Sequence, residues 1–225
     1  MKKFKIVMLV FPDLTILDLT GPYDVFIRAS CFEVIVVGQT MLPIKAEGGL
    51  SITPGYSFED CPMADILFVP GGKGITPLLI NKTYHTFLQK QAAGAQYVTA
   101  VCTGSLLLAA SGLLKGYKAT THWRSLQLLR MFGVEAIEKR VVVDGNRMTG
   151  GGITAGIDFG LTLTALTAGT DIAKTVQLLL EYNPEPPFQS GLPKTAEPHI
   201  LEMAMKITQP LFESRIKLIQ QLTNT

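Results

Sequence analysis

Residues 97–114, YVTAVCTGSLLLAASGLL, predict a buried strand, a sharp turn and a helix in direct succession. The apolar run 98–101 ends at Cys102, and residues 103–105 then open a run of leucine and alanine that is too long to be a second strand. A side chain on such a turn projects from the carboxyl end of a buried strand, and the small residues after it allow a substrate to approach. This geometry suits a nucleophile, and the residue on the turn is a cysteine.

The helix after Cys102 influences the chemistry of the thiol. Its first turn has backbone N–H groups without helical partners and carries partial positive charge, which favours a thiolate over a thiol. The pattern therefore predicts a Cys102 of low pKa with an oxyanion site beside it. The alternative is a buried structural cysteine, since free cysteines are among the most buried residues, but the position on the turn favours the functional interpretation.

The composition fits one large α/β domain spanning residues 1–225. Hydrophobic residues make up 47% of the chain and the mean hydropathy is +0.30, which predicts well-buried strands. The net charge is only +2 and the basic residues are scattered, so no nucleic-acid or membrane partner is expected. The apolar run near the start is too short for a secretory signal, and no run approaches the roughly 18 residues of a membrane span.

The three cysteines, Cys31, Cys61 and Cys102, lie far apart in the sequence. There is no CxxC motif and no neighbouring histidine pair, which argues against a disulfide framework and against a zinc site. This usage predicts a cytoplasmic protein.

Strands and helices alternate along the chain. Apolar runs predict strands at 4–10, 31–38, 65–69, 98–101, 134–137 and 140–143, and a glycine-rich strand end at 148–156. Helical patterns cover 23–29, 83–95, the segment after Cys102, 125–132, 157–168 and 171–181. Further expected features are a hairpin at 43–54, a proline-rich segment at 183–194, and an amphipathic helix at 197–222 bent at Pro210. The alternation predicts a doubly wound α/β sandwich with a mostly parallel central sheet.

Four loops of this sandwich carry residues suited to chemistry. They hold Asp18, Gly71-Gly72, Cys102 and Gly151-Gly152, and each follows a predicted strand. Because ligands bind at the carboxyl ends of parallel strands, we expect the four loops to gather at one edge of the sheet. Gly71 and Gly72 can present backbone N–H groups to a ligand, and a simple tight turn is the alternative.

Asp18 is expected in the loop between the first strand and the first helix. Thr20 or Gly21 can cap that helix, and Pro22 can occupy its first position. The functional interpretation makes Asp18 an acid–base group near the thiol. The alternative is a helix-capping or solvent-facing acid.

Six segments together resemble the ThiJ/PfpI superfamily. They are LDLTGPYDV, VPGGKGI, YVTAVCTGSLLLAASGLL, ATTHW, TGGGITAGIDF and LEYNPEPPF, and they run from residue 17 to residue 188. The resemblance is greatest to the isonitrile-hydrating members, because DLTGP places Asp18 where many members of the superfamily carry a glutamate facing the thiol. It implies a flavodoxin-like core of the class I glutamine amidotransferase type, and a homodimer, since the superfamily is typically dimeric.

The resemblance also implies an activity and a set of site residues. The implied reaction is the hydration of small-molecule isonitriles to N-substituted formamides, with Cys102 as nucleophile, Asp18 as acid–base group, and no metal or organic cofactor. The hydroxyl of Thr103 would orient the thiolate or water, and the N–H groups of Thr103 and Gly72 would stabilise negative charge. The expected substrate-binding residues are Gly71, Gly72, His122, Trp123, Gly152 and Ile153.

Several alternatives to this function stay open. The favoured alternative for His122 is a structural histidine, and Trp123 is expected in the pocket wall or core and not in a catalytic role. A glyoxalase-type enzyme of the same superfamily would use the same thiol on methylglyoxal, but normally pairs it with glutamate rather than with an aspartate such as Asp18. The third possibility is a non-enzymatic sensor related to the sensor domains of AraC-type regulators, in which Cys102 is only oxidation-prone.

Overall fold

The computed structural model describes residues 3–223, and a six-stranded sheet forms its centre. The strands of this sheet are β1 (Phe4–Leu9), β2 (Phe32–Val37), β5 (Ile66–Val69), β6 (Tyr97–Val101), β9 (Val141–Asp144) and β10 (Arg147–Gly150). They lie in the order β2-β1-β5-β6-β10-β9, and every neighbouring pair is parallel except β10 and β9. The first five strands follow the 2-1-3-4-5 order of flavodoxin-like folds. The predicted fold class is confirmed; residues 1–2 and 224–225 of the predicted domain lie outside the described residues.

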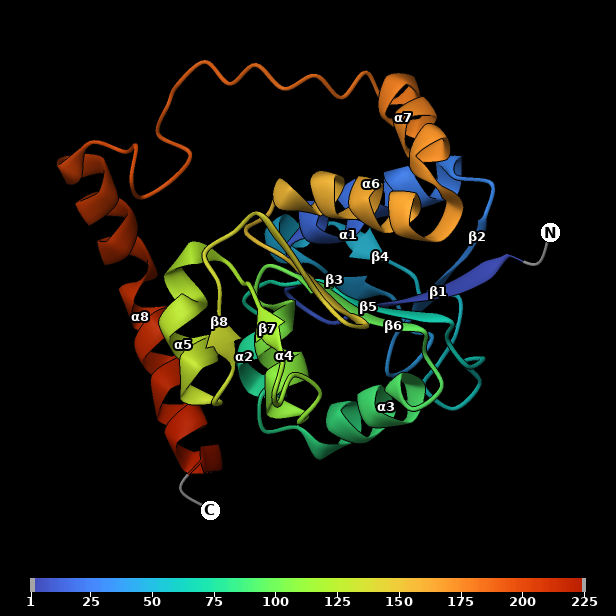
Figure 1. The fold of residues 1–225 in the computed structure, drawn as a ribbon. Helices are drawn as coiled ribbons and strands as arrows, with labels where there is room; N and C mark the ends of the chain where they lie inside the picture. The colour runs from blue at the N-terminus through green and yellow to red at the C-terminus, as the bar shows by residue number, and fades with distance from the viewer. Residues whose placement is uncertain (1–2, 224–225) are drawn as a thin grey trace.

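Helices cover both faces of the sheet (Figure 1). One face carries α1 (Ile16–Arg28), α6 (Ala155–Ala168) and α7 (Thr170–Leu179). The other carries α2 (Ile75–Leu78), α3 (Lys82–Ala92), α4 (Gly104–Ala110) and α5 (Leu126–Met131). Two small sheets lie outside the main one: the expected hairpin of β3 (Ile44–Lys45) and β4 (Ser51–Ile52), and the parallel pair β7 (Lys118–Ala119) and β8 (Glu135–Ala136).

The core lies along the central strands. Residues 6–9 of β1 and 66–69 of β5 are completely buried, as expected of apolar strands covered on both faces. Burying such side chains contributes roughly 1.5–3 kcal/mol each. The resulting rigid sheet fixes the positions of the loops at its carboxyl edge.

The start of α1 differs from the prediction. The helix begins at Ile16 after the N-cap Thr15, so Asp18 lies in its first turn and not in the preceding loop. The backbone N–H of Asp18 donates to the carbonyl of Thr15 at 3.0 Å, which closes that first turn. Pro22 is inside the helix and not at its first position. As the seventh residue of the helix, this proline removes the hydrogen bond that a backbone N–H would make to the carbonyl of Asp18.

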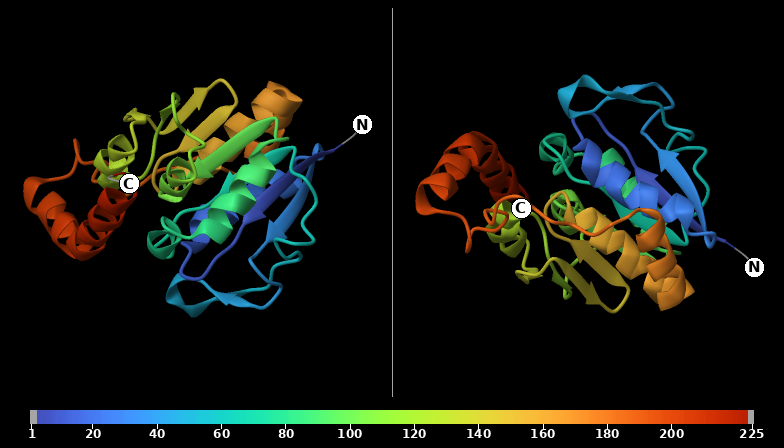
Figure 2. Two further views of the ribbon diagram at one scale, coloured as in Figure 1. Left: turned by 90° about the horizontal axis from the view of Figure 1, so that it is seen from below. Right: turned by 90° about the horizontal axis from the view of Figure 1, so that it is seen from above.

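The C-terminal helix α8 (Pro198–Thr223) packs beside α5 and α2. An exposed proline-rich segment joins it to α7 across the outside of the molecule (Figure 1). Pro210 is within the helix, and Figure 2 shows the helix bent along its length. Only two residues of α8 are buried, Arg215 and Ile219. No helix within residues 3–223 combines the length and apolar character needed to cross a bilayer.

Candidate active site

Cys102 occupies the predicted turn between β6 and α4, in a backbone conformation with a φ of +52°. Non-glycine residues rarely adopt positive φ, and they do so where the surroundings hold them. Here the N–H of Cys102 donates to the carbonyls of Gly150 (3.0 Å) and Gly151 (2.9 Å). Its carbonyl accepts from the hydroxyls of Ser105 (3.0 Å) and Thr121 (2.8 Å). Four hydrogen bonds therefore hold the strained turn that carries the thiol.

The carboxyl group of Asp18 and the side chain of Cys102 meet at Gly71. A β-carbon added to Gly71 would lie 2.8 Å from Asp18 Oδ2, 2.8 Å from the Cys102 β-carbon and 2.6 Å from the Thr103 nitrogen. Only glycine fits between these groups. The loops after β1, β5 and β6 thus converge at the carboxyl edge of the sheet, as expected, where the strand order reverses direction between β1 and β5.

Asp18 is completely buried, and no geometrically regular hydrogen bond to its carboxyl oxygens occurs within residues 3–223. Desolvation raises the pKa of Asp18 to about 7; interactions with the Cys102 thiol and the backbone of Gly71 offset part of this effect. The contacts of the carboxyl oxygens with the Cys102 thiol and the Gly71 backbone are close but poorly aligned. The carboxyl group is therefore poised between its acid and base forms near neutral pH.

The pKa of Cys102 is not low, contrary to the sequence-based prediction. Burial raises it well above the ordinary value of 9.0, and the neighbouring Asp18 raises it further. The backbone N–H groups of Thr103 and Ile153 act in the opposite direction by hydrogen-bonding to the sulfur. The helix terminus alone does not outweigh desolvation, because the residue is only 5% exposed. Asp18 and Cys102 thus form a pair that carries at most one negative charge near neutral pH.

The roles expected of Thr103 and Gly72 need correction. The Thr103 hydroxyl accepts from the N–H of Gly72 at 3.0 Å and donates to the Gly72 carbonyl at 3.3 Å. It therefore fixes the glycine turn and does not orient the thiolate, and the N–H of Gly72 is not available for a substrate. The N–H of Gly71 likewise acts on Asp18. Both glycines position the acid and the thiol, and the N–H pair facing the sulfur is that of Thr103 and Ile153.

His122, Trp123, Gly152 and Ile153 border the same turn. A β-carbon on Gly152 would lie 2.7 Å from the His122 ring, so the ring and the glycine backbone are in close contact. His122 Nδ1 accepts from the N–H of Arg124 at 3.3 Å, and burial is the main cause that lowers the pKa of His122 to about 4. The imidazole is therefore neutral at physiological pH. Ile153 is 37% exposed and offers apolar surface next to the sulfur, and the half-buried ring of Trp123 lies 5.5 Å from the ring of His122.

Arg215 is a site residue that the sequence analysis missed. It comes from α8, and it donates from Nη2 to the Gly72 carbonyl at 2.8 Å and from Nε to the Thr76 hydroxyl at 3.0 Å. Arg215 lies one turn after Leu211 and one turn before Ile219 on the face of α8 that packs inward. A charged residue within an apolar helical stripe is the signal that identifies such a position.

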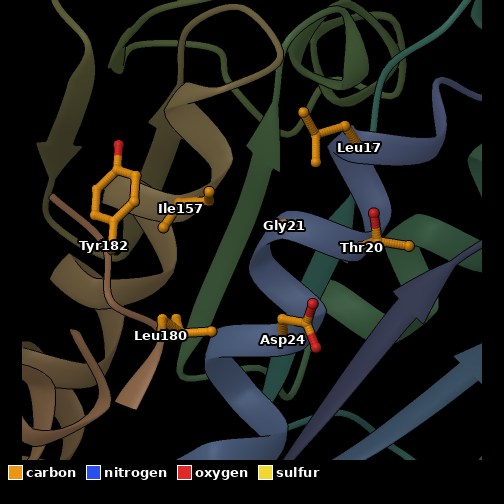
Figure 3. A pocket seen from close by; sticks show the side chains of 7 residues that line it. All are labelled: Leu17, Thr20, Gly21, Asp24, Ile157, Leu180 and Tyr182. Atoms are coloured by element: carbon orange, nitrogen blue, oxygen red, sulfur yellow. The ribbon is translucent and has the colours of Figure 1, made fainter. Parts of the chain in front are cut away.

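A cavity of about 140 Å³ lies on the other side of α1, between α1, α6 and the end of α7 (Figure 3). Its lining residues are Leu17, Thr20, Gly21, Asp24, Ile157, Leu180 and Tyr182. Asp18 and Cys102 do not line it, so this cavity is separate from the thiol. Among residues 3–223, no three histidine, cysteine or carboxylate side chains gather into a metal-binding group.

Comparisons with known proteins identify the family of this chain. A model of the DJ-1/PfpI family matches residues 4–166, which include the Asp18, Gly71 and Cys102 loops. The chain belongs to the DJ-1/PfpI family. This confirms the resemblance inferred from the six sequence segments.

Among its relatives, this DJ-1/PfpI protein is 47% identical to isonitrile hydratase of Pseudomonas putida over 213 residues, which cover 95% of this chain and 93% of that enzyme. A crystal structure of a ThiJ/PfpI family protein from Pseudomonas syringae superposes with a TM-score of 0.94 at 39% identity, covering 97% of this chain and 91% of the other. The transcriptional regulator GbdR of Pseudomonas aeruginosa is 36% identical over 141 residues, but that region is only 38% of the regulator.

Proposed function

We propose that this protein is a hydro-lyase that hydrates isonitriles to N-substituted formamides, with Cys102 as the nucleophile and Asp18 as the acid–base group. The observation that carries the proposal is the pairing of a carboxyl group of pKa about 7 with the thiol across Gly71. The similarity to an isonitrile hydratase over 95% of the chain supports the choice of reaction.

The first half of the reaction needs one proton and one nucleophile at the same carbon. Asp18 accepts the thiol proton while the sulfur attacks the terminal carbon of R–N≡C, so that the S–H bond breaks and a C–S bond forms. The electron pair displaced from the carbon–nitrogen bond moves to nitrogen. The carbon then takes the proton from Asp18, which yields the thioimidate R–N=CH–S–Cys102 and returns Asp18 to its carboxylate form.

The second half adds water to the thioimidate carbon. The oxygen of water forms the new C–O bond, one proton of the water reaches the nitrogen, and the carbon becomes tetrahedral. The C–S bond then breaks, and the remaining O–H proton passes through Asp18 to the sulfur. The products are R–NH–CHO and the free thiol of Cys102. The N–H groups of Thr103 and Ile153 favour the negative charge that collects on sulfur as this bond breaks.

The buried position of the thiol favours a slender substrate. Cys102 is 5% exposed, and an isonitrile presents a linear terminal carbon that is narrower than the carbonyl group of methylglyoxal. The R group is then left near the apolar side chains of Trp123 and Ile153. Gly152 permits the close approach of the His122 ring that shapes this region.

The test is a parallel turnover assay. Purified protein is incubated with cyclohexyl isonitrile or with methylglyoxal, and the formamide and lactate are quantified. We expect formamide as the main product, and a loss of at least about 100-fold in kcat for Asp18→Asn, because one group serves both proton transfers. Asp24→Asn is the matched control, since Asp24 is an exposed acid on the same helix.

Two outcomes would contradict the proposal. Production of lactate without formamide would favour the glyoxalase alternative. The absence of turnover with either substrate, together with peroxide-dependent loss of the Cys102 thiol, would favour a sensor like the corresponding part of the regulators.

We also propose that the protein forms a homodimer and acts in the cytoplasm. Apolar side chains of α7 and the following segment support association, because Leu178 is 81% exposed and Phe188 is 78% exposed. The separated cysteines and the absence of a CxxC motif support the location.

A further inference from the structure

Arg215 is an unusual feature of the core because a charged guanidinium is almost fully enclosed. The residue is 4% exposed, and no carboxylate among residues 3–223 lies within ion-pairing distance of it. Its two hydrogen bonds go to neutral acceptors, the Thr76 hydroxyl and the Gly72 carbonyl. Burying a charge without an ionic partner has a large cost in desolvation free energy. We therefore expect a negative charge nearby that compensates for this cost.

The active-site pair of Asp18 and Cys102 is the source of negative charge that we consider. A Cys102 thiolate raises the pKa of Arg215, as does Glu47, although burial lowers it overall to about 10. Burial is the main cause of the lowered pKa of His122, and Arg215 lowers it further. Arg215 is therefore protonated at neutral pH. Because an electrostatic interaction is reciprocal, the guanidinium favours the thiolate form of Cys102.

Hydrogen bonds connect Arg215 to the glycine turn that lies between the two reacting groups. Its Nη2 holds the carbonyl of Gly72, and the Gly72 N–H holds the hydroxyl of Thr103, the residue that follows Cys102. The neighbouring Gly71 lies between Asp18 and Cys102, since a β-carbon added to it would be 2.8 Å from Asp18 Oδ2 and 2.8 Å from the Cys102 β-carbon. A displacement of this glycine turn would therefore alter the distance between the acid and the thiol.

We propose that Arg215 is a positioning residue of the active site: its guanidinium, supplied by α8, holds the Gly71-Gly72 turn and balances the negative charge that Asp18 and Cys102 share. The effect of Arg215 on turnover rests on the proposed hydratase function. The charge balance itself does not, because it concerns the thiol in the absence of substrate. The helix α8 is accordingly a part of the site, although it lies outside the sheet and its covering helices (Figure 1).

The test compares Arg215→Met and Arg215→Lys with Lys217→Met, which removes an exposed positive charge from the same helix. The first measurement is the pH dependence of alkylation of Cys102 by iodoacetamide, followed on the Cys102 peptide by mass spectrometry to exclude Cys31 and Cys61. The second is kcat and KM with cyclohexyl isonitrile. Thermal unfolding of each variant verifies that it is folded.

For Arg215→Met we expect the alkylation midpoint to move up by about one pH unit, which slows alkylation about tenfold below the midpoint. We expect kcat to fall about tenfold or more while KM changes less than about twofold. Arg215→Lys should regain most of the alkylation rate, and Lys217→Met should match the original protein. A purely structural role for Arg215 would not produce this charge-dependent pattern.

A folded Arg215→Met variant with an unchanged alkylation midpoint would overturn the proposal. If Arg215→Met does not fold, Arg215→Gln retains a donor for the Gly72 carbonyl without the charge, and an unchanged midpoint in that variant overturns the proposal equally. Failure of the hydratase assay in the original protein would remove the proposed function alone, because the alkylation measurement needs no isonitrile.

Discussion

At the scale of single residues, the burial of Asp18 links catalysis to stability. The pKa of Asp18 rises from the ordinary 3.8 to about 7 on folding, mainly through desolvation. Between these two values the folded protein binds one proton more than the unfolded chain. The free energy of unfolding therefore falls as the pH rises through this window, and Asp18 destabilises the fold most when it is ionised.

Asp18→Asn removes this dependence. We expect the free energy of unfolding of the variant, relative to the original protein, to increase by about 2 to 3 kcal/mol between pH 5 and pH 8. Urea denaturation at both pH values measures the difference. Asp24→Asn serves as the control, and a difference that does not change with pH would show that Asp18 is ionised at low pH.

The sequence was sufficient to place Asp18, Gly71 and Cys102 at the same edge of the sheet, because each lies in the connection or the first helical turn after a strand whose apolar run is easily recognised. It was not sufficient to predict the state of the thiol. Helix termini and charges are visible in a sequence, but the degree of burial that raises the pKa of Cys102 is set by packing. Arg215 was missed for a related reason: it lies 113 positions after Cys102, and only the packing of α8 brings the two together.

At the scale of elements, α8 depends on a few contacts near the site. The guanidinium of Arg124 lies 3.7 Å above the ring of Phe212 and donates to the Thr208 hydroxyl (3.2 Å) and to Gln209 Oε1 (2.6 Å). Arg124 follows Trp123, so these contacts join the wall of the site to the helix that supplies Arg215.

Arg124→Met should weaken the contact between residue 124 and α8 while retaining most of the side-chain volume. We expect the free energy of unfolding to fall by about 1 kcal/mol, since a cation–π contact and partly exposed hydrogen bonds are lost. Chemical denaturation measures the loss. Lys206→Met, which changes an exposed residue of α8, is the control. Equal stability of the Arg124 variant and the original protein would show that α8 is held by its apolar face alone.

The elements were predictable to the extent that their pattern is long and regular. The main strands and α3, α5, α6 and α7 begin and end within a few residues of the predicted positions. The start of α1 was misplaced because Thr15, Thr20 and Gly21 are all possible caps, and Pro22 favours the later start. The four-residue α2 was not predicted, because it is too short to show a helical period.

At the scale of the whole molecule, exposed apolar side chains predict self-association. Leu178 and Phe188, and also Leu179 at 64% and Leu192 at 60% exposure, lie on α7 and the segment that leads to α8. Sedimentation velocity should give the mass of a dimer, and Leu178→Asp combined with Phe188→Asp should shift the protein toward the monomer. A monomer at all concentrations in the original protein would contradict the proposed dimer.

The account as a whole depends on a bond between the Cys102 sulfur and the terminal carbon of the isonitrile. The most direct measurement is the rate of N-cyclohexylformamide formation by Cys102→Ala, in a preparation shown by thermal unfolding to be folded. We predict that this rate does not exceed the rate without protein. Formamide production by Cys102→Ala at a rate close to that of the original protein would contradict nucleophilic attack by the thiol.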